Sequence, residues 1–384
     1  MTAQARYDVS VSSDWPATRD RWQASADAST ATPFQSVAWL DAWYTTMPRQ
    51  GEIDPVLVEV RSGGALALRL ALIARRTAGQ HVLQFADHDL TDFNAPILGP
   101  AAPETLRDAA KLWQALTRAL PDIDLVDFRK MPLAVDGQAN PLALLADTAP
   151  CPLTGHLITF TSDWNAYHAG LDRRVRMEFE RCWRVFLKAP DATFVRLREA
   201  APAQRAIDFL DRQQSVRMAE SGLPFQLDRP REAAFYRHDL AQRLATGDVV
   251  VTAMMCGGEM VAALYGIANA QTTVILRIAN AGPTWAKISP GRLIVHRTLH
   301  HLHETGVRAV DLSIGDYDYK RRMGPVATPL VDLVTALSWK GRAFALRHRA
   351  ITAVRGYPAV EMQLRRILGR RDPATGKRVG QSIQ

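Results

Sequence analysis

The sequence predicts an α/β protein whose helices are layered on a mixed, largely antiparallel sheet. The chain has 384 residues, of which 47% are hydrophobic and 22% are charged, as in soluble globular proteins large enough for two domains. Segments with helical spacing alternate with short β-rich runs. The turn CGGE at 256–259 lies between two such runs, which indicates antiparallel neighbours. Together these features indicate an α/β layered fold with a mixed sheet.

The N-terminal part contains a first round of helices and strands. Aromatic and apolar residues at helical spacing predict a helix at 34–47, which ends before Pro48. The turn RSGG separates two predicted strands, and a polar, proline-bounded segment at 86–100 is a predicted loop. The predicted strands are 55–60, 65–75, 81–86 and 123–128, with a further helix at 103–120. An Ala-, Leu- and Pro-rich connection at 139–152 ends this round, so we expect a first domain over residues 1–150.

A second round follows and predicts a second domain over residues 151–340. An arginine-rich helical pattern is expected at 163–188, and two helices at 203–221 and 231–246 are each closed by a glycine. The predicted strands are 192–197, 248–255, 260–268, 272–280 and 309–314. The first round has the same element order in shorter form, from which we infer a duplication.

Composition limits the class of protein. The first residues lack the apolar core of a signal peptide, and no stretch approaches the roughly 20 apolar residues of a membrane span, so we expect a cytoplasmic protein. The three cysteines are far apart and predict neither a disulfide framework nor a zinc cluster. The net charge of +8 is concentrated at the end of the chain, where residues 340–384 carry eleven Lys and Arg against two acids. We expect a basic helical tail over 341–384, either a solvated face or a surface for an anionic partner.

The segment KISPGRLIVHRTLHHLHETG at 287–306 predicts a helix with a well-defined start. Ser289 suits the N-cap and Pro290 the first helical position, while Gly291 leaves the first turn open to a close neighbour. Leu293 belongs to the apolar stripe of this helix. Its free N–H groups and dipole favour a phosphate, and the plain alternative is a capped structural helix.

Histidines on the same helix raise a second hypothesis. His296, His300 and His303 lie at i, i+4 and i+7, a spacing that places three imidazoles on one face and could hold zinc. No HExxH motif is present and no carboxylate is placed as a further ligand, so we expect no metal. Between the two hypotheses the sequence favours the anion site.

A polar cluster follows the last predicted strand of the second round. It contains Asp316, Tyr317, Tyr319 and Lys320, beside two arginines. A tyrosine can act as a general acid, and a lysine can stabilise an oxyanion or a phosphate. The plain alternative is a polar turn with solvated side chains.

Taken in order, several segments resemble the GNAT acyltransferases, and in particular their FemAB-like branch, which includes CelD-like proteins labelled cellulose-biosynthesis acetyltransferases. The segments are TPFQSVAWLDAWY, DLTDFNAPILGP, LDRRVRMEFERCWRVF, SPGRLI…ETG and DLSIGDYDYKRRMG, within about residues 30–340. The resemblance implies two GNAT-like domains facing a central cleft, the second binding acyl-CoA. SPGR replaces the usual Q/R-x-x-G-x-G/A phosphate loop, which leaves the individual contacts open.

The resemblance also implies roles for residues. Ser289, Pro290, Gly291, Arg292 and Leu293 would bind acyl-CoA, with its pyrophosphate near Ser289, Gly291 and Arg292. Tyr319 is the first candidate acid and Tyr317 the second, and Lys320 would contact an oxyanion or phosphate. No glutamate lies on 272–280, so a water or Asp316 is the candidate base. Asp92 and Asn94 would face the acceptor, and the alternative for both is a hydrogen-bonded turn.

These features predict an acyl-CoA-dependent N-acyltransferase that acts on an amine of a cell-envelope precursor, such as an amino sugar of an exopolysaccharide or a long-chain amine lipid. Its basic tail would lie on an anionic inner membrane surface. One alternative is a FemAB-type transferase using aminoacyl-tRNA, but the tail lacks the interleaved aromatics of a single-strand binder, which disfavours nucleic acid. Another is a non-catalytic, membrane-associated subunit of polysaccharide synthesis.

Overall fold

A computed structural model describes residues 7–25, 29–47, 51–77, 79–161 and 163–355. The N-terminal half begins with a strand and two helices, continues with a meander of strands and ends in a long strand at the centre of the molecule. Its strands are β1 (Tyr7–Ser12), β2 (Ile53–Ser62), β3 (Ala65–Thr77), β4 (Gln80–Phe85), β5 (Ile97–Leu98), β6 (Leu125–Pro132), β7 (Ala134–Val135), β8 (Gln138–Ala139) and β9 (Thr148–Thr159). Its helices are α1 (Trp15–Gln23), the 3-10 turn η2 (Pro33–Gln35), α2 (Val37–Thr46) and α3 (Leu106–Ala119).

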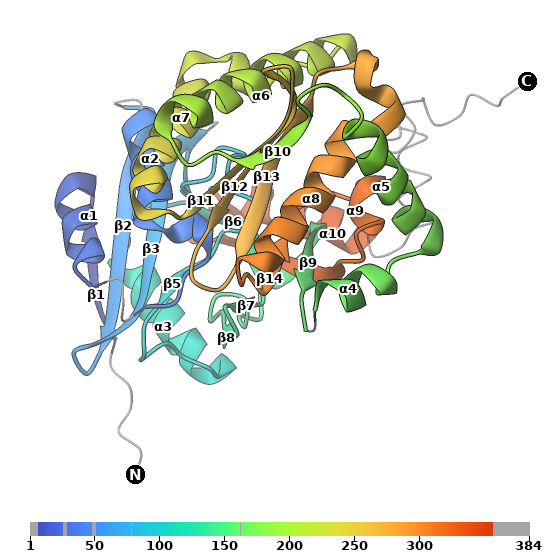
Figure 1. Cartoon of the computed structure of the whole chain (residues 1–384). Coiled ribbons are helices and arrows are strands. Elements are labelled where there is room, and N and C mark those ends of the chain that lie inside the picture. The colour runs from blue at the N-terminus through green and yellow to red at the C-terminus, as the bar shows by residue number, and fades with distance from the viewer. Residues whose placement is uncertain (1–6, 26–28, 48–50, 78, 162, 356–384) are drawn as a thin grey trace, which may run out of the picture.

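The C-terminal half follows the same plan with longer helices. Its strands are β10 (Thr193–Arg196), β11 (Val249–Cys256), β12 (Glu259–Ala268), β13 (Thr273–Asn280), β14 (Ala309–Asp311) and β15 (Val326–Ala336). Its helices are α4 (Trp164–Gly170), α5 (Arg173–Phe186), α6 (Ala200–Glu220), α7 (Pro230–Thr246), α8 (Pro290–Glu304), α9 (Asp318–Arg321) and α10 (Arg342–Arg355), with 3-10 turns η3 (Gln226–Asp228) and η4 (Pro283–Ile288). Figure 1 shows α6 and α7 on one side of β11–β13, and α8 with α5 and α4 on the other.

Apart from the β7–β8 hairpin, the described strands form one continuous mixed sheet, and its order shows how the halves are joined. The order is β1-β2-β3-β4-β6-β15-β9-β14-β13-β12-β11-β10. In each half four antiparallel strands are followed by a parallel neighbour, β6 beside β4 and β14 beside β13. The last strand of each half then pairs with the other half, because β9 lies against β14 and β15 lies against β6. The halves therefore exchange their final strands, which fixes one relative to the other.

The hydrophobic cores follow the same arrangement. One core is shared by the two halves and contains aromatic side chains of α2 and α7, such as Trp39 and Phe235, whose ring centroids are 4.6 Å apart. On the opposite face, α3 covers a separate core of the N-terminal half. The helices α5 and α8 cover another in the C-terminal half, where Phe179 and Leu299 are buried. Burial of both faces of the sheet explains why several strands read as continuous apolar runs.

The predicted α/β class and mixed, largely antiparallel sheet are confirmed, but several element boundaries are wrong. The expected connection at 139–152 follows a small hairpin, β7–β8, and contains the start of β9 at Thr148. The expected helix at 163–188 is two helices, because the carboxylate of Asp172 accepts from the N–H of Arg174 at 2.7 Å and starts a new one. The strands at 7–12 and 326–336 are not among those predicted from the sequence. Since β9 begins before residue 150 and pairs beyond it, a division into residues 1–150 and 151–340 remains a proposal.

Candidate active site

The sheet opens between β13 and β14. These parallel strands share only two register pairs, Thr273 with Val310 and Val274 with Asp311, although β13 continues to Asn280. The register between β12 and β13 also shifts at Gly266, which leaves Leu276 as the extra residue of a bulge. A Cβ at Gly266 would lie 2.6 Å from the carbonyl oxygen of Val274, so only glycine allows β13 this close. The bulge and the early end of pairing create an opening beside the start of α8.

The start of α8 differs from a simple capped helix. Ser289 occupies the N-cap with a left-handed backbone, φ 48°, and its hydroxyl makes no capping hydrogen bond. That hydroxyl instead accepts a hydrogen bond from Nη2 of Arg292 at 2.7 Å, and the same nitrogen donates to Glu178 at 2.6 Å. The N–H groups of Arg292 and Leu293 donate to the carbonyl of Ser289. Within the described chain, the N–H of Gly291 is thus the donor of the first turn that has no acceptor.

A cavity of about 520 Å³ brings most of the predicted acyl-CoA residues together. It is lined by Ser289, Pro290, Gly291, Arg292, Tyr317 and Tyr319, by Leu276, Ile278 and Asn280 of β13, and by Gln214 and Arg217 of α6. The predicted Leu293 is not among them, because it is buried in the core under α8. Sequence reasoning missed Arg217, an exposed cation without an ion-pair partner among the described residues, whose only signal was its place in the last turn of a helix.

The four residues predicted for catalysis lie in different surroundings. Tyr317 and Tyr319 have stacked rings with centroids 6.1 Å apart, and burial raises the pKa of Tyr319 well above its ordinary value. Its hydroxyl therefore stays protonated and suits hydrogen-bond donation better than complete proton transfer. Asp316 is solvent-exposed and forms an ion pair with Arg321, so it does not lie in the cavity.

Lys320 is buried and is bound to the loop that follows β14. Its Nζ donates to the carbonyl oxygens of Ser313 at 3.0 Å and Ile314 at 2.6 Å. Burial lowers the pKa of Lys320 to about 8, although nearby carboxylates including Asp92 and Asp311 oppose this shift. Lys320 therefore supports the loop beside the cavity and does not line it.

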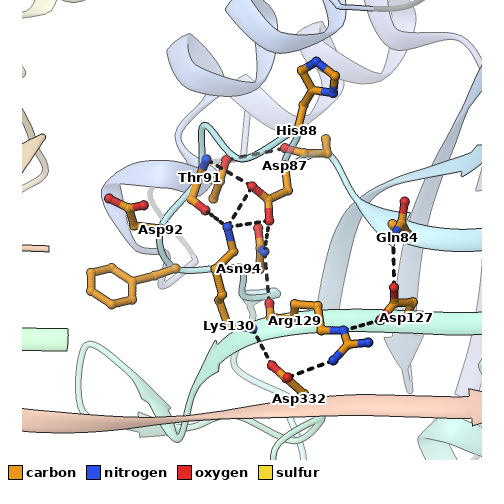
Figure 2. A network of polar contacts seen from close by, with 12 residues as sticks. Gln84, Asp87, His88, Thr91, Asp92, Asn94, Asp127, Arg129, Lys130 and Asp332 are labelled. Atoms are coloured by element: carbon orange, nitrogen blue, oxygen red, sulfur yellow. Dashed lines mark hydrogen bonds and ion pairs between the residues drawn. The ribbon is translucent and has the colours of Figure 1, made fainter. Parts of the chain in front are cut away.

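The predicted acceptor residues of the 86–96 loop have separate roles. Asn94 is fully engaged, since its Nδ2 donates to Asp87 at 2.8 Å and to the carbonyl of Arg129 at 3.0 Å. It belongs to a polar network with Lys130 and Asp87, shown in Figure 2, so for Asn94 the hydrogen-bonded alternative describes what the structure shows. Asp92 lies apart from this network and accepts a hydrogen bond from the hydroxyl of Ser313 in the other half.

The same network explains why the two halves differ. The parallel strands β4 and β6 also share only two register pairs, so the N-terminal half has an equivalent opening. There the polar network of Figure 2 surrounds a cavity of about 480 Å³, and Asp127, Arg129 and Asp332 form ion pairs within it. The next helix, α3, carries Asp108 in its first turn, and this carboxylate disfavours an anion at that N-terminus. The opening in the C-terminal half is the better site for an anionic ligand.

Comparison with known proteins is consistent with this geometry. Residues 173–321 match the model of the acetyltransferase (GNAT) domain. This part of the chain is a GNAT domain. FemX is structurally similar, with a TM-score of 0.58, 8% identity, and coverage of 83% of this chain and 96% of FemX. The C-terminal domain of a putative lysylphosphatidylglycerol synthetase from Agrobacterium fabrum has a TM-score of 0.50, 13% identity, and coverage of 88% and 97%. No curated protein matches the sequence.

These findings confirm the resemblance to the FemAB-like branch as a matter of fold, and the GNAT domain makes the chain an acyltransferase. The matched range includes the bulged strand β13, the start of α8 and the tyrosine pair. The cavity beside α8 therefore lies within the recognised domain.

At the apex of the opening lies Asp311, a buried carboxylate that sequence reasoning missed. Oδ1 of Asp311 accepts from the N–H of Ser313 at 2.6 Å and, more weakly, from that of His156 at 3.5 Å. Burial raises the pKa of Asp311 to about 6 and also raises that of Asp92, while Lys320 acts in the opposite direction on both. The only sequence signal for Asp311 was its place at the end of an apolar strand.

The histidine face of α8 packs against aromatic side chains. His296 is 6% exposed, stacks on Phe179 with centroids 4.3 Å apart, and neither of its ring nitrogens has a hydrogen-bond partner. Trp164 of α4 contacts the rings of His296 and His300. Over the described residues no group of His, Cys, Asp or Glu side chains is arranged to hold a metal ion. This face of α8 therefore packs against α4 and α5.

The predicted basic tail falls largely outside the described residues, because they end at Arg355. The part of the predicted tail from residue 356 onward lies beyond that point. Its beginning corresponds to α10, which follows an exposed Trp339 and carries exposed Phe344 and Leu346. None of the helices in the described ranges is long and apolar enough to cross a membrane.

Proposed function

We propose that the chain is an acyl-CoA-dependent N-acyltransferase that binds its thioester in the cavity between β13, the start of α8 and the tyrosine pair. The observation that carries this proposal is the opening of the sheet beside a helix start inside a GNAT domain. The N–H of Gly291 and the α8 dipole favour the pyrophosphate. Arg217 adds a positive charge at the same cavity.

The catalysed reaction is attack of an amine on the thioester carbonyl carbon. Binding both reactants in one opening converts a bimolecular reaction into an intramolecular one, which contributes most when the geometry is fixed. The protonated hydroxyl of Tyr319 would donate a hydrogen bond to the thioester oxygen or to the leaving sulfur. Lys320 would contribute indirectly, by holding the carbonyls of Ser313 and Ile314.

A cell-envelope acceptor is part of the proposal. The name of the Agrobacterium protein includes a phospholipid, lysylphosphatidylglycerol, and its domain shares this fold. Exposed Trp339 and Leu346 lie beside Lys340, Arg342 and Arg347, a combination that favours an anionic bilayer surface. Co-sedimentation with phosphatidylglycerol vesicles at low salt, weakened by Trp339→Ala, would support the membrane contact. Equal binding to neutral phosphatidylcholine vesicles, or none to either, would remove it.

Isothermal titration with acetyl-CoA and with a long-chain acyl-CoA tests the thioester site. Gly291→Asp places a carboxylate where the pyrophosphate is expected, and we predict that binding weakens by at least about tenfold. Gly291→Ala controls for bulk, because its Cβ would meet only the side-chain amide of Asn280 at 3.3 Å. Gly170→Asp adds the same charge at a glycine with no atoms within 4 Å. If neither thioester binds the wild type, or if all three variants bind alike, the proposal is wrong.

A further inference from the structure

A second cavity, of about 380 Å³, lies between the two halves and its lining is mainly apolar. The N-terminal half contributes Pro33, Phe93 and Leu133, together with Leu157 of β9. The C-terminal half contributes Val274 and Leu330, among others. Two carboxylates, Asp311 and Asp136, are the charged groups of this lining. An apolar cavity that contains carboxylates complements a ligand with a cationic group attached to an apolar part.

The cavity lies at the apex of the opening in which we place the thioester. Val274 and Asp311 are register partners, the last pair before β13 and β14 stop pairing, and both line this cavity. Leu276, two residues further along β13, already lines the acyl-CoA cavity. Since a strand rises about 3.3 Å per residue, the two linings are about 7 Å apart along one strand. An amine in the apolar cavity would thus approach the thioester from the apex.

Asp311 is the group in this cavity that is equipped to accept a proton. Its Oδ1 is held by the N–H groups of Ser313 and His156, whereas no partner is assigned to Oδ2 in the described chain. Burial and the neighbouring Asp92 raise the pKa of Asp311 to about 6, against the effect of Lys320. Its ionised form at neutral pH is therefore a stronger base than an exposed aspartate. Asp136, in contrast, accepts a hydrogen bond from Asn269 at 3.2 Å.

We propose that this cavity between the halves is the acceptor site, that its ligand is a primary amine attached to an apolar group, and that Asp311 is the general base. The proposal rests on the acyl-CoA-dependent transfer proposed above. It selects long-chain or otherwise apolar amines over amino sugars among the acceptors considered, because hydroxyl groups of a sugar would lose hydrogen bonds to water in an apolar lining.

The step balances as follows. The amine binds as its ammonium ion, and Oδ2 of Asp311 takes one of its three N–H protons. The neutral nitrogen then attacks the thioester carbonyl carbon and forms the new C–N bond, and the tetrahedral intermediate loses a second N–H proton to water. The C–S bond then breaks with its electron pair on sulfur, and the CoA thiolate takes a proton from water. The products are an amide and CoA, and Asp311 returns its proton to solvent.

Release of CoA thiol with acetyl-CoA and either n-octylamine or glucosamine tests the ligand class. We expect kcat/KM for octylamine to exceed that for glucosamine by at least tenfold. Ala134→Trp should raise the KM for octylamine at least fivefold, because exposed Ala134 lines the cavity and the indole would fill it without disturbing the core. Leu106→Trp, on exposed residue 106 of α3, is the matched control and should leave both parameters unchanged.

Asp311→Asn tests the base while keeping the Oδ1 acceptor for Ser313. We expect kcat/KM for octylamine to fall about 100-fold, with the Kd for acetyl-CoA within twofold of wild type. In the wild type kcat/KM should fall as the pH drops below about 6, the pKa of Asp311, and this limb should vanish in the variant. Asp92, Lys320 and His156 face Asp311 and are present in both proteins. A purely structural role would leave the limb in place.

The outcomes separate the two proposals. Failure of acetyl-CoA to bind would reject the proposed function, and the acceptor site with it. Acetyl-CoA binding with equal or better use of glucosamine, with no transfer to either amine, or with no effect of Ala134→Trp would overturn the acceptor site alone. Retention of the acid limb in Asp311→Asn would overturn the role of Asp311.

Discussion

Replacing Arg243 by methionine tests how the two halves are held together. Arg243 of α7 is fully buried, and its Nε donates to Asp239 at 2.8 Å. Its Nη2 reaches the N-terminal half, where it donates to the hydroxyl of Ser36 at 2.6 Å and to the carbonyl of Pro33 at 2.9 Å. Methionine fills a similar volume without donors, so the variant isolates the loss of these bonds from the creation of a cavity.

The size of the effect follows from what remains in the variant. Asp239 is also fully buried, and among the residues that the structure describes it would keep only the hydroxyl of Tyr265 as a partner. Breaking a buried pair by removing one partner costs about 3–5 kcal/mol, chiefly because the other charge stays buried. We therefore expect the free energy of unfolding to fall by about 4 kcal/mol, a large part of the roughly 5–15 kcal/mol typical of native proteins.

Urea unfolding followed by tryptophan fluorescence and by far-ultraviolet circular dichroism measures this change. Arg243→Met/Asp239→Asn removes the uncompensated charge, so it should be more stable than Arg243→Met alone. A loss below about 1 kcal/mol in the single variant, or a double variant whose loss equals the sum of the two single ones, would refute the reasoning.

Three further variants test the site and its surroundings. Gly266→Ala should lower the free energy of unfolding by about 1–3 kcal/mol and weaken acetyl-CoA binding, because the new Cβ would lie 2.6 Å from a carbonyl oxygen of β13. An unchanged urea midpoint together with an unchanged Kd would contradict the role of the bulge. His296→Phe should become more stable than the wild type as the pH falls, because burial lowers the pKa of His296 to about 3. Between that value and 6.5, the unfolded wild-type chain binds a proton at this imidazole that the folded chain does not. Between pH 6.5 and pH 5.0 the free energy of unfolding of the wild type, measured in urea, should fall by about 2 kcal/mol relative to that of the variant. A difference between the two proteins that does not change with pH would argue against a buried neutral imidazole. Tyr319→Phe should lower kcat about 100-fold at unchanged Kd for acetyl-CoA, with a smaller effect for Tyr317→Phe, and an unchanged kcat would exclude the hydroxyl as donor.

The sequence carried enough information for the class of fold and for the position of α8. Capping residues, glycine stops and the CGGE turn are local signals, and they act within a few residues of where they are read. The start of α8 at Pro290 and the strands on either side of the CGGE turn are such cases. The exchange of β9 and β15 between the halves has no local signal, because it depends on which edges lie together in space.

The candidate site shows the same limit. The residues near Ser289 and the tyrosine pair could be predicted, because a helix start and an unusual polar run can be read directly from the sequence. Periodicity did not reveal that Arg292 would be bound to Glu178, 114 positions away. Nor did it show that Lys320 would be buried, or that Asp311 would lie at the apex of the opening. These properties arise from contacts between distant segments.

A crystal structure of the protein with acetyl-CoA tests the central claim most directly. The account predicts the pyrophosphate within hydrogen-bond distance of the N–H of Gly291, and the thioester between Leu276 and Tyr319. Acetyl-CoA bound in the N-terminal half instead, in the cavity beside Arg129 and Lys130, would contradict it.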